Sequence, residues 1–279
     1  MGGGIAQVLA TSGRHVLLHD AEPAAVERGL GAMRRSLERI AAKGRELDPD
    51  DVVARVEPVA DLAEAELMIE AVVEAAAVKE EIFRRADEAL PPAAILASNT
   101  SSIRIASLAA ATTRPDRVIG MHFFNPVPVM GLVEVVRAPA TSDETVADIV
   151  ALARDLGKTP AEVNDSPGFV SNRILMPLIN EAAYALRDGV AEAEAIDTVA
   201  KLGFNHPLGP LALADLIGLD TCVAIMEVLH RGFGNPKYEP CPLLREHVAA
   251  GRLGRKSGRG FYEYASVARR VPARRGRRT

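Results

Sequence analysis

Residues 1–10 read MGGGIAQVLA and residues 15–20 read HVLLHD. The first stretch is typical of a helix entered through glycines, and the second of a short strand that ends in an acid. Together they form the second half of a dinucleotide-binding unit, in which glycines let the backbone approach a pyrophosphate and the acid binds ribose hydroxyls. We therefore expect Gly2 and Asp20 to contact a dinucleotide. On these residues alone, a flexible glycine-rich terminus is the alternative.

The first half of this unit is missing from the sequence. A full G-x-G-x-x-G pattern follows a strand and contains two earlier glycines, whereas Gly2 can only be the third glycine, with Met1 directly before it. We expect an N-terminally truncated chain that lacks the first strand, which is normally a central one. Two explanations stay open: the coding sequence starts upstream, or the truncation is real and leaves two strand edges exposed.

Short apolar runs alternate with helical patterns up to residue 165. The expected strands are 15–19, 66–73, 94–98, 117–123 and 132–137, with helices at 24–43 and 78–89 between them. This alternation predicts an α/β fold with a Rossmann-like, doubly wound, mostly parallel sheet. The patterns after Pro167-Gly168 are helical, at 169–188, 191–202, 210–229 and 243–250. We therefore predict a nucleotide-binding domain over 1–165 and an all-helical domain over 166–264.

Composition narrows the class of protein. The net charge is −4, so we expect no nucleic-acid partner for the protein as a whole. Residues 265–279 carry six arginines and no acid, which is typical of a disordered tail; an arm that binds nucleic acid or an anionic surface is the alternative. Cys222 and Cys241 are too few for a disulfide scaffold, so both are expected to be reduced thiols in a cytoplasmic protein. No apolar run approaches the roughly 20 residues that cross a bilayer, so no membrane association is expected. No metal site is expected either.

A longer set of motifs points to one family. They are residues 70–74 (EAVVE), 78–83 (VKEEIF), 97–102 (ASNTSS), 120–128 (GMHFFNPVP), 132–136 (LVEVV), 165–173 (DSPGFVSNR) and 253–262 (LGRKSGRGFY). In this order and spacing they closely resemble the 3-hydroxyacyl-CoA dehydrogenase family, and residues 237–244 (KYEPCPLL) resemble its bacterial 3-hydroxybutyryl-CoA branch. The resemblance implies an NAD-dependent enzyme of fatty-acid or butanoate metabolism, which interconverts (S)-3-hydroxyacyl-CoA and 3-ketoacyl-CoA. It also implies a homodimer formed through the helical domain.

His122 and Glu134 are the expected acid–base pair. Oxidation of a secondary alcohol needs a base for the hydroxyl proton, and histidine fits because its unperturbed pKa is about 6.5. An acid inside the apolar stretch 132–136 is costly without a partner, and the resemblance implies that Glu134 binds the imidazole. It also places Ser101 and Asn172 around the C3 oxygen of the substrate. The alternatives are a helix N-cap for Ser101 and a surface helix position for Asn172.

The resemblance implies further residues on the cofactor side. Asp20, Glu74, Lys79 and Asn99 match family positions that line NAD, and an acid at Asp20 disfavours the 2′-phosphate of NADP. Ala75 stands where the family usually has asparagine.

The acyl-CoA thioester would contact the helix expected at 24–43. Ser36 and Lys43 match family positions that touch the CoA portion, and Arg39 falls beside them on one helix face. An ordinary solvated charged face is the alternative reading.

Two other functions stay open on the sequence alone. The chain could be a non-catalytic remnant that binds CoA esters or only dimerises, because the pyrophosphate cradle is incomplete. It could also act on another hydroxy acid, such as a sugar acid, because His122 and Glu134 would serve that reaction equally well.

Overall fold

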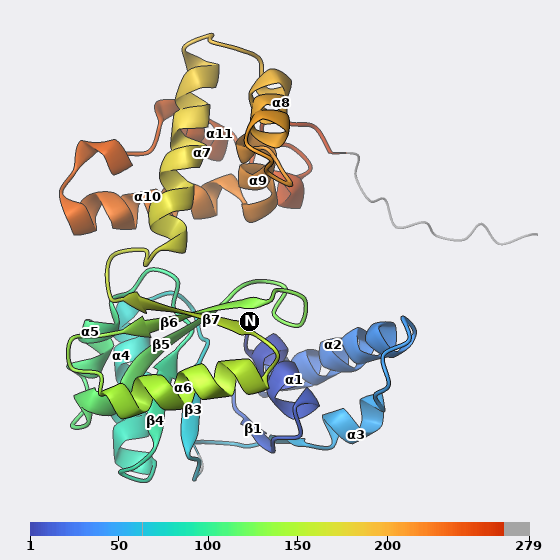
Figure 1. Cartoon of the computed structure of the whole chain (residues 1–279), viewed down its shortest axis with the longest axis vertical. Helices are drawn as coiled ribbons and strands as arrows, with labels where there is room; N and C mark the ends of the chain where they lie inside the picture. Colours follow the sequence, from blue (N-terminus) through green and yellow to red (C-terminus); the bar gives the residue numbers. More distant parts are fainter. Residues whose placement is uncertain (63, 265–279) are drawn as a thin grey trace, which may run out of the picture. The chain divides into compact units, whose positions relative to one another are not determined.

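The computed structural model describes residues 1–62 and 64–264, and its internal contacts divide the chain into two units, Met1–Val170 and Ser171–Thr279 (Figure 1). The sequence predicts the boundary five residues earlier. The arginine-rich segment 265–279 lies outside the described residues, so its predicted disorder stays a prediction.

The first unit alternates strands and helices. In chain order its elements are α1 (Gly2–Thr11), β1 (Val16–Leu18), α2 (Pro23–Ala41), α3 (Pro49–Val53), β2 (Val56–Pro58), β3 (Leu67–Glu70), α4 (Ala76–Ala89), β4 (Ile95–Ser98), α5 (Ile105–Ala109), β5 (Val118–Phe123), β6 (Leu132–Arg137), α6 (Asp143–Asp155) and β7 (Thr159–Asn164). This confirms the predicted α/β, Rossmann-like fold.

The strands form two sheets. β1 and β2 pair in parallel, and a five-stranded sheet has the order β3-β4-β5-β6-β7, in which only the β5–β6 pair is antiparallel. No ladder joins β1 to β3 within residues 1–62 and 64–264. The strands β3, β4 and β5 run in the same direction, so their carboxyl ends point to one edge of the sheet.

Helices cover both faces of the five-stranded sheet (Figure 1). Side chains alternate between the faces along each strand, as the two-residue period of a strand requires. Ile119, Met121 and Phe123 of β5 pack with α1 and α6, whereas Val118 packs with α4 and α5 on the other face. His122 therefore lies on the α4–α5 side of the sheet.

The second unit is all-helical, as predicted. It contains α7 (Ser171–Arg187), α8 (Ala193–Gly203), α9 (Pro210–Ile217), α10 (Leu219–Phe233) and α11 (Pro242–Ala249) around a core that includes Met176, Ile179, Met226 and Leu229. The single helix predicted over 210–229 is wrong. Gly218 has a φ of +106° and ends α9, because no residue in that conformation continues a right-handed helix.

Strand lengths show two further differences. β3 ends at Glu70 although the apolar pattern continues to Val73, because the chain there turns toward α4. β2 and β7 are absent from the prediction: β2 is only three residues long, and β7 contains Pro160, which argues against a strand. β7 is an edge strand, where proline is tolerated. No helix in the part of the chain that the structure describes is long and apolar enough to cross a membrane.

Candidate active site

His122 and Glu134 are partners across the only antiparallel ladder of the five-stranded sheet. The register of β5 and β6 places His122 directly opposite Glu134. Opposed residues of a ladder point to the same face, so their side chains meet. Nδ1 of His122 lies 2.8 Å from Oε2 of Glu134, and both residues are buried, at 7% and 2% exposure. The sequence-predicted pair is therefore brought together by strand register.

The pair is enclosed by aromatic rings and one backbone donor. The His122 imidazole lies 4.8 Å from the ring of Phe124 and 5.9 Å from that of Phe169, measured between centroids. The N–H of Val170 donates to Oε1 of Glu134 at 3.2 Å. Each oxygen of the Glu134 carboxylate thus has a partner, which holds the carboxylate in the orientation that receives Nδ1.

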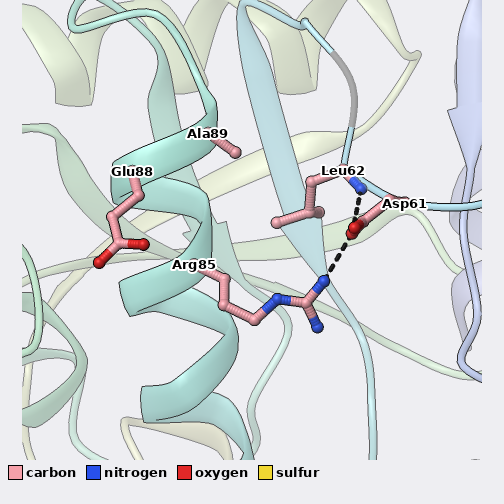
Figure 2. Close-up of a pocket in the computed structure, with 5 residues that line it drawn as sticks. All are labelled: Asp61, Leu62, Arg85, Glu88 and Ala89. Atoms are coloured by element: carbon pink, nitrogen blue, oxygen red, sulfur yellow. Dashed lines mark hydrogen bonds and ion pairs between the residues drawn. The ribbon is translucent and has the colours of Figure 1, made fainter.

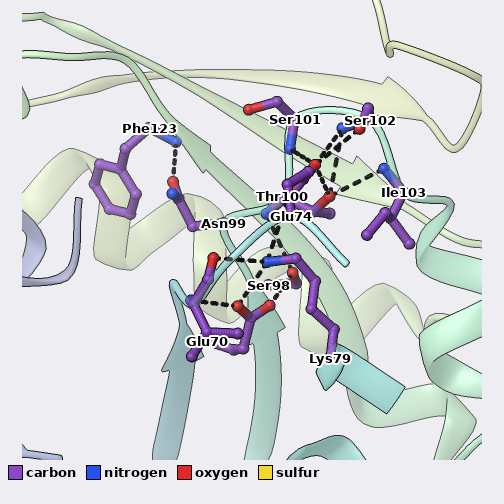
Figure 3. A network of polar contacts seen from close by, with 11 residues as sticks. Glu70, Glu74, Lys79, Ser98, Asn99, Thr100, Ser101, Ser102, Ile103 and Phe123 are labelled. Carbon is purple, nitrogen blue, oxygen red and sulfur yellow. Dashed lines mark hydrogen bonds and ion pairs between the residues drawn. The ribbon is translucent and has the colours of Figure 1, made fainter. Parts of the chain in front are cut away.

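Glu74 organises the loop that carries Ser101 (Figure 3). Its Oε1 accepts hydrogen bonds from Oγ1 of Thr100 at 2.6 Å, from the N–H groups of Ser101 and Ser102 at 2.9 and 3.0 Å, and from Oγ of Ser102 at 2.9 Å. Burial raises the pKa of the Glu74 carboxyl, but these hydrogen bonds and the charge of Lys79 outweigh it, so the pKa lies below its ordinary value. Glu74 is therefore held as a carboxylate.

The N-cap alternative for Ser101 is wrong. Helix α5 begins at Ile105 and its N-cap residue is Arg104. Ser101 is half-buried in the loop that follows β4, and its N–H donates to Glu74 rather than serving a helix. Its predicted contact with the substrate oxygen stays a prediction.

Two other predicted cofactor residues have partners within the protein. Oδ1 of Asn99, a buried residue, accepts from the N–H of Phe123 at 2.9 Å and so ties the end of β4 to the residue after His122. Lys79 is 1% exposed, and its Nζ lies 2.6 Å from Glu70 and 3.3 Å from Glu74. In this structure both side chains shape the strand ends, and direct contact with a cofactor stays a prediction for each.

The start of α1 and the end of β1 supply complementary groups. An added Cβ at Gly2 would lie 3.9 Å from Ala71, so α1 begins beside the carboxyl end of β3. The N–H groups of a first helical turn have no partner within the helix, which suits a pyrophosphate. The chain reverses after Thr11, so Asp20, an exposed carboxylate just beyond β1, returns toward the same end.

The predicted CoA-facing residues are only partly on one helix. Ser36 and Arg39 lie on α2, half-buried and exposed respectively. Helix α2 ends at Ala41, so Lys43 lies beyond it and does not share its face, contrary to the sequence prediction. Asn172 is a buried residue of α7 in the second unit. Its predicted place at the substrate oxygen stays a prediction.

A surface depression of about 250 Å³ lies elsewhere on the first unit (Figure 2). It is lined by Leu62 before β3 and by Arg85, Glu88 and Ala89 at the end of α4, with Arg85 paired to Asp61 at 2.5 Å. These residues lie at the amino ends of the strands, on the edge opposite His122. The depression is therefore separate from the candidate site.

Comparison with known proteins follows the same division of the chain. The model of the 3-hydroxyacyl-CoA dehydrogenase NAD binding domain matches residues 1–166, and that of the C-terminal domain of the same family matches residues 168–264. The chain belongs to the 3-hydroxyacyl-CoA dehydrogenase family. It is thus an NAD-dependent oxidoreductase, as the motifs predict.

Individual members of the 3-hydroxyacyl-CoA dehydrogenase family match over nearly their whole length. A "Probable 3-hydroxybutyryl-CoA dehydrogenase" of Bacillus subtilis is 58% identical over 95% of this chain and 94% of its own. The 3-hydroxybutyryl-CoA dehydrogenase of Bradyrhizobium diazoefficiens is 49% identical over 98% and 95%. The crystal structure of (S)-3-hydroxybutyryl-CoA dehydrogenase from Ralstonia eutropha superposes with a TM-score of 0.91 at 50% identity, with 95% of each chain covered. This coverage gives no evidence for the truncation expected from the sequence.

The groups present fit the NAD that the family requires. The N–H groups of the first turn of α1, at Gly2 and Gly3, are donors of the kind that a pyrophosphate accepts from, and the exposed carboxylate of Asp20 is an acceptor of the kind that ribose hydroxyls donate to. Their contact with NAD stays a prediction. The 2′-phosphate of NADP would meet that carboxylate as a like charge. The donor set therefore favours NAD.

Glu70, at the same edge of the sheet, is not among the site residues that the sequence predicts. Glu70 is a buried carboxylate at the end of β3, in contact with Lys79, Ser98 and the N–H of Val72. The signal was present in the sequence: like Glu134, Glu70 is an acid inside an apolar run, which is costly without a partner.

Proposed function

We propose that this protein interconverts (S)-3-hydroxybutyryl-CoA and acetoacetyl-CoA with NAD, as a step of fatty-acid or butanoate metabolism. The observation that carries the proposal is the buried His122–Glu134 pair at the ligand edge of the sheet. The names of relatives at 58% and 49% identity support 3-hydroxybutyryl-CoA as the substrate.

His122 is proposed to exchange the proton of the C3 oxygen. Because Nδ1 is bonded to the Glu134 carboxylate, Nδ1 carries a proton and Nε2 is the ring nitrogen left for the substrate. In the oxidation direction Nε2 accepts the hydroxyl proton, and in the reduction direction it returns it. NAD, when bound, accepts or supplies the hydride at C3.

Glu134 is proposed to act on the imidazole. Its carboxylate fixes the tautomer and ring orientation, and its negative charge stabilises the imidazolium that forms during oxidation. Because the pair is buried among Phe124 and Phe169, little water screens this interaction. Ser101 and Asn172 are proposed to orient the C3 oxygen, which is an electrostatic contribution.

The substrate class is tested by comparing two ketones with the wild-type protein. Acetoacetyl-CoA and acetoacetate share the reacting carbonyl, and only the first carries the CoA portion that Ser36 and Lys43 are proposed to bind. We expect NADH oxidation, followed by absorbance, with acetoacetyl-CoA and at least about 100-fold lower kcat/KM with acetoacetate. Equal rates with both, or turnover of a sugar acid alone, would refute the CoA-ester assignment.

The non-catalytic remnant predicts a different result. Titration calorimetry would then show heat on addition of acetoacetyl-CoA and none on addition of NADH. We expect heat with both ligands. Binding of NADH is expected because the N–H donors of α1 and the Asp20 carboxylate are both present.

The second unit is proposed to form a homodimer. Large apolar side chains are exposed on α8 and just after it: Val199 at 58%, Leu202 at 82% and Phe204 at 60%. Large exposed apolar side chains that follow one another along a short segment are typical of an interaction site. Sedimentation equilibrium should report a dimer for the wild type and a weakened dimer for Leu202→Glu. A monomeric wild type would refute the proposal.

A further inference from the structure

Glu70 occupies a position at which the ends of three elements meet. It is the last residue of β3, and the parallel register pairs it with Ser98, the last residue of β4. Its side chain is fully buried. A carboxylate without water depends entirely on the donors that the protein provides.

The two carboxylate oxygens of Glu70 have different partners (Figure 3). Oε1 accepts from Nζ of Lys79 at 2.6 Å and from the N–H of Val72 at 2.7 Å. Oε2 accepts from Oγ of Ser98 at 2.6 Å. These contacts join the end of β3, the first turns of α4 and the end of β4 through one side chain.

Two partners of the Glu70 carboxylate, Lys79 and Ser98, lead on to the loop of residues 99–102. Lys79 also pairs with Glu74, whose other oxygen accepts the N–H groups of Ser101 and Ser102. The hydroxyl of Ser98, in turn, accepts the N–H of Thr100 at 3.1 Å.

A third link runs through the backbone. The carbonyl of Glu70 accepts the N–H of Asn99 at 2.8 Å, and Oδ1 of Asn99 accepts the N–H of Phe123, the residue after His122. The loop that carries Ser101 is thus connected to Glu70 by two side-chain routes and one backbone route.

We infer that Glu70 is a positioning residue of this enzyme, which fixes the 99–102 loop, and with it Ser101, through Lys79, Glu74 and Ser98. The effect on catalysis rests on the proposed function of Ser101, whereas the effect on the loop does not. Glu70 acts through its charge, because Lys79 is buried between two carboxylates. A neutral group at position 70 would leave the Lys79 ammonium with one ion pair, the 3.3 Å pair to Glu74, beside a 3.4 Å contact with the carbonyl of Val72.

The matched substitutions are Glu70→Gln and Glu66→Gln. Glutamine keeps the size of the side chain and an acceptor oxygen, and removes the charge. Glu66 lies just before β3 and is exposed, so the same change there alters the charge of the protein without touching the loop. Ser98→Ala is a milder second variant, because it removes only the Oε2 route.

Amide hydrogen exchange measures the loop directly and needs no activity. In Glu70→Gln we expect the amides of residues 100–103 to exchange at least about tenfold faster, because the bonds that hold them open more often. Ser98→Ala should show a smaller increase, and Glu66→Gln none. Unchanged exchange in Glu70→Gln would overturn the inference, even if that variant were less stable overall.

Kinetics tests whether the positioning reaches the reaction. Glu70→Gln should lower kcat for acetoacetyl-CoA at least about tenfold with little change in the KM for acetoacetyl-CoA, whereas a general loss of structure would change both. Ser101→Ala should lower kcat less in the Glu70→Gln background than in the wild type, since both changes affect one unit. Additive effects of the two substitutions, or an unchanged kcat despite faster exchange, would overturn the claim that Glu70 positions Ser101 for the reaction. If the wild type lacks activity, the proposed function fails, and the exchange result alone decides whether Glu70 fixes the 99–102 loop.

Discussion

His122 and Glu134 face each other across the β5–β6 ladder with 2.8 Å between Nδ1 and Oε2. The contact depends on the reversal of direction between these two strands, because β6 then brings its third residue back beside the fifth residue of β5. A one-residue shift of this register would turn Glu134 to the opposite face and leave the imidazole without its carboxylate.

Replacement of Glu134 tests the electrostatic part of this pair. Glu134→Gln keeps the shape of the side chain and removes the charge that stabilises an imidazolium. We expect kcat/KM for acetoacetyl-CoA to fall about 10²- to 10⁴-fold, with the dissociation constant of NADH unchanged in a fluorescence titration. A loss below threefold would show that Glu134 has only a structural role.

Glu162→Gln is the matched control for that change. Glu162 lies on β7, next to β6, where its register partner is Val135, and its side chain is exposed. The same loss of charge one strand away should leave kcat/KM within about twofold of the wild type.

Gly120 controls how closely the two strands approach. It lies opposite Val136, and an added Cβ would stand 2.6 Å from Cβ of Val136 and 3.0 Å from Ile105. Gly120→Ala should therefore destabilise the protein by about 1–3 kcal/mol through overpacking. It should also lower kcat, because the added methyl group pushes β5 and β6 apart at a position two residues from His122. Urea unfolding and the activity assay measure the two effects.

Gly29→Ala provides the contrast. Gly29 lies in α2, and an added Cβ there meets nothing within 4 Å. Because alanine is the better helix former, we expect a gain of roughly 0.5–1 kcal/mol in the free energy of unfolding. Equal destabilisation in both variants would contradict the packing argument for Gly120.

Cofactor preference should depend on Asp20. Asp20→Asn removes the like charge that a 2′-phosphate would meet, and weakens the acceptor for the ribose hydroxyls. We expect weaker NADH binding, by about tenfold, and a smaller preference for NADH over NADPH. Asp51→Asn, at an exposed position of α3, is the control. An unchanged ratio of the two dissociation constants would place the ribose elsewhere.

His247 should make the stability of the protein depend on pH. Burial lowers the pKa of this imidazole, and Arg252 lowers it further, against the opposite effect of Asp215 and Glu246. The unfolded chain, with a histidine pKa of about 6.5, then binds the proton more readily than the folded chain. The stability that depends on a neutral His247 is therefore fully present above about pH 6.5, and it is lost as the pH falls below that value.

His247→Phe removes this proton-binding difference. Urea unfolding between pH 8 and pH 5 should show a smaller loss of stability toward pH 5 in the variant than in the wild type. In the wild type the His247 ring lies 4.9 Å from the Phe261 ring, measured between centroids. The phenyl ring of the variant keeps a ring contact at this position. Identical pH dependence in the two proteins would contradict the assignment.

The sequence predicts the pair and the fold for physical reasons that can be stated residue by residue. Glu134 is recognisable because a charge inside an apolar strand needs a partner, and the motifs supply His122. The same reasoning, applied to Glu70, would have identified this buried carboxylate as well.

Other features depend on contacts that no local pattern contains. Lys79 reads as a cofactor contact on an ordinary helix, and only the fold shows that it is buried between Glu70 and Glu74. Gly218 reads as a tolerated helix residue, and the break between α9 and α10 becomes visible only through its positive φ. Lys43 reads as a helix position because the charged pattern continues past Ala41, where α2 ends.

The central claim is that His122 exchanges the substrate proton, and the rate of NADH oxidation with acetoacetyl-CoA tests it most directly. The wild type should oxidise NADH, and His122→Gln should do so at least about 100-fold more slowly in kcat while binding NADH as tightly as the wild type. Equal kcat in His122→Gln and the wild type would contradict the account.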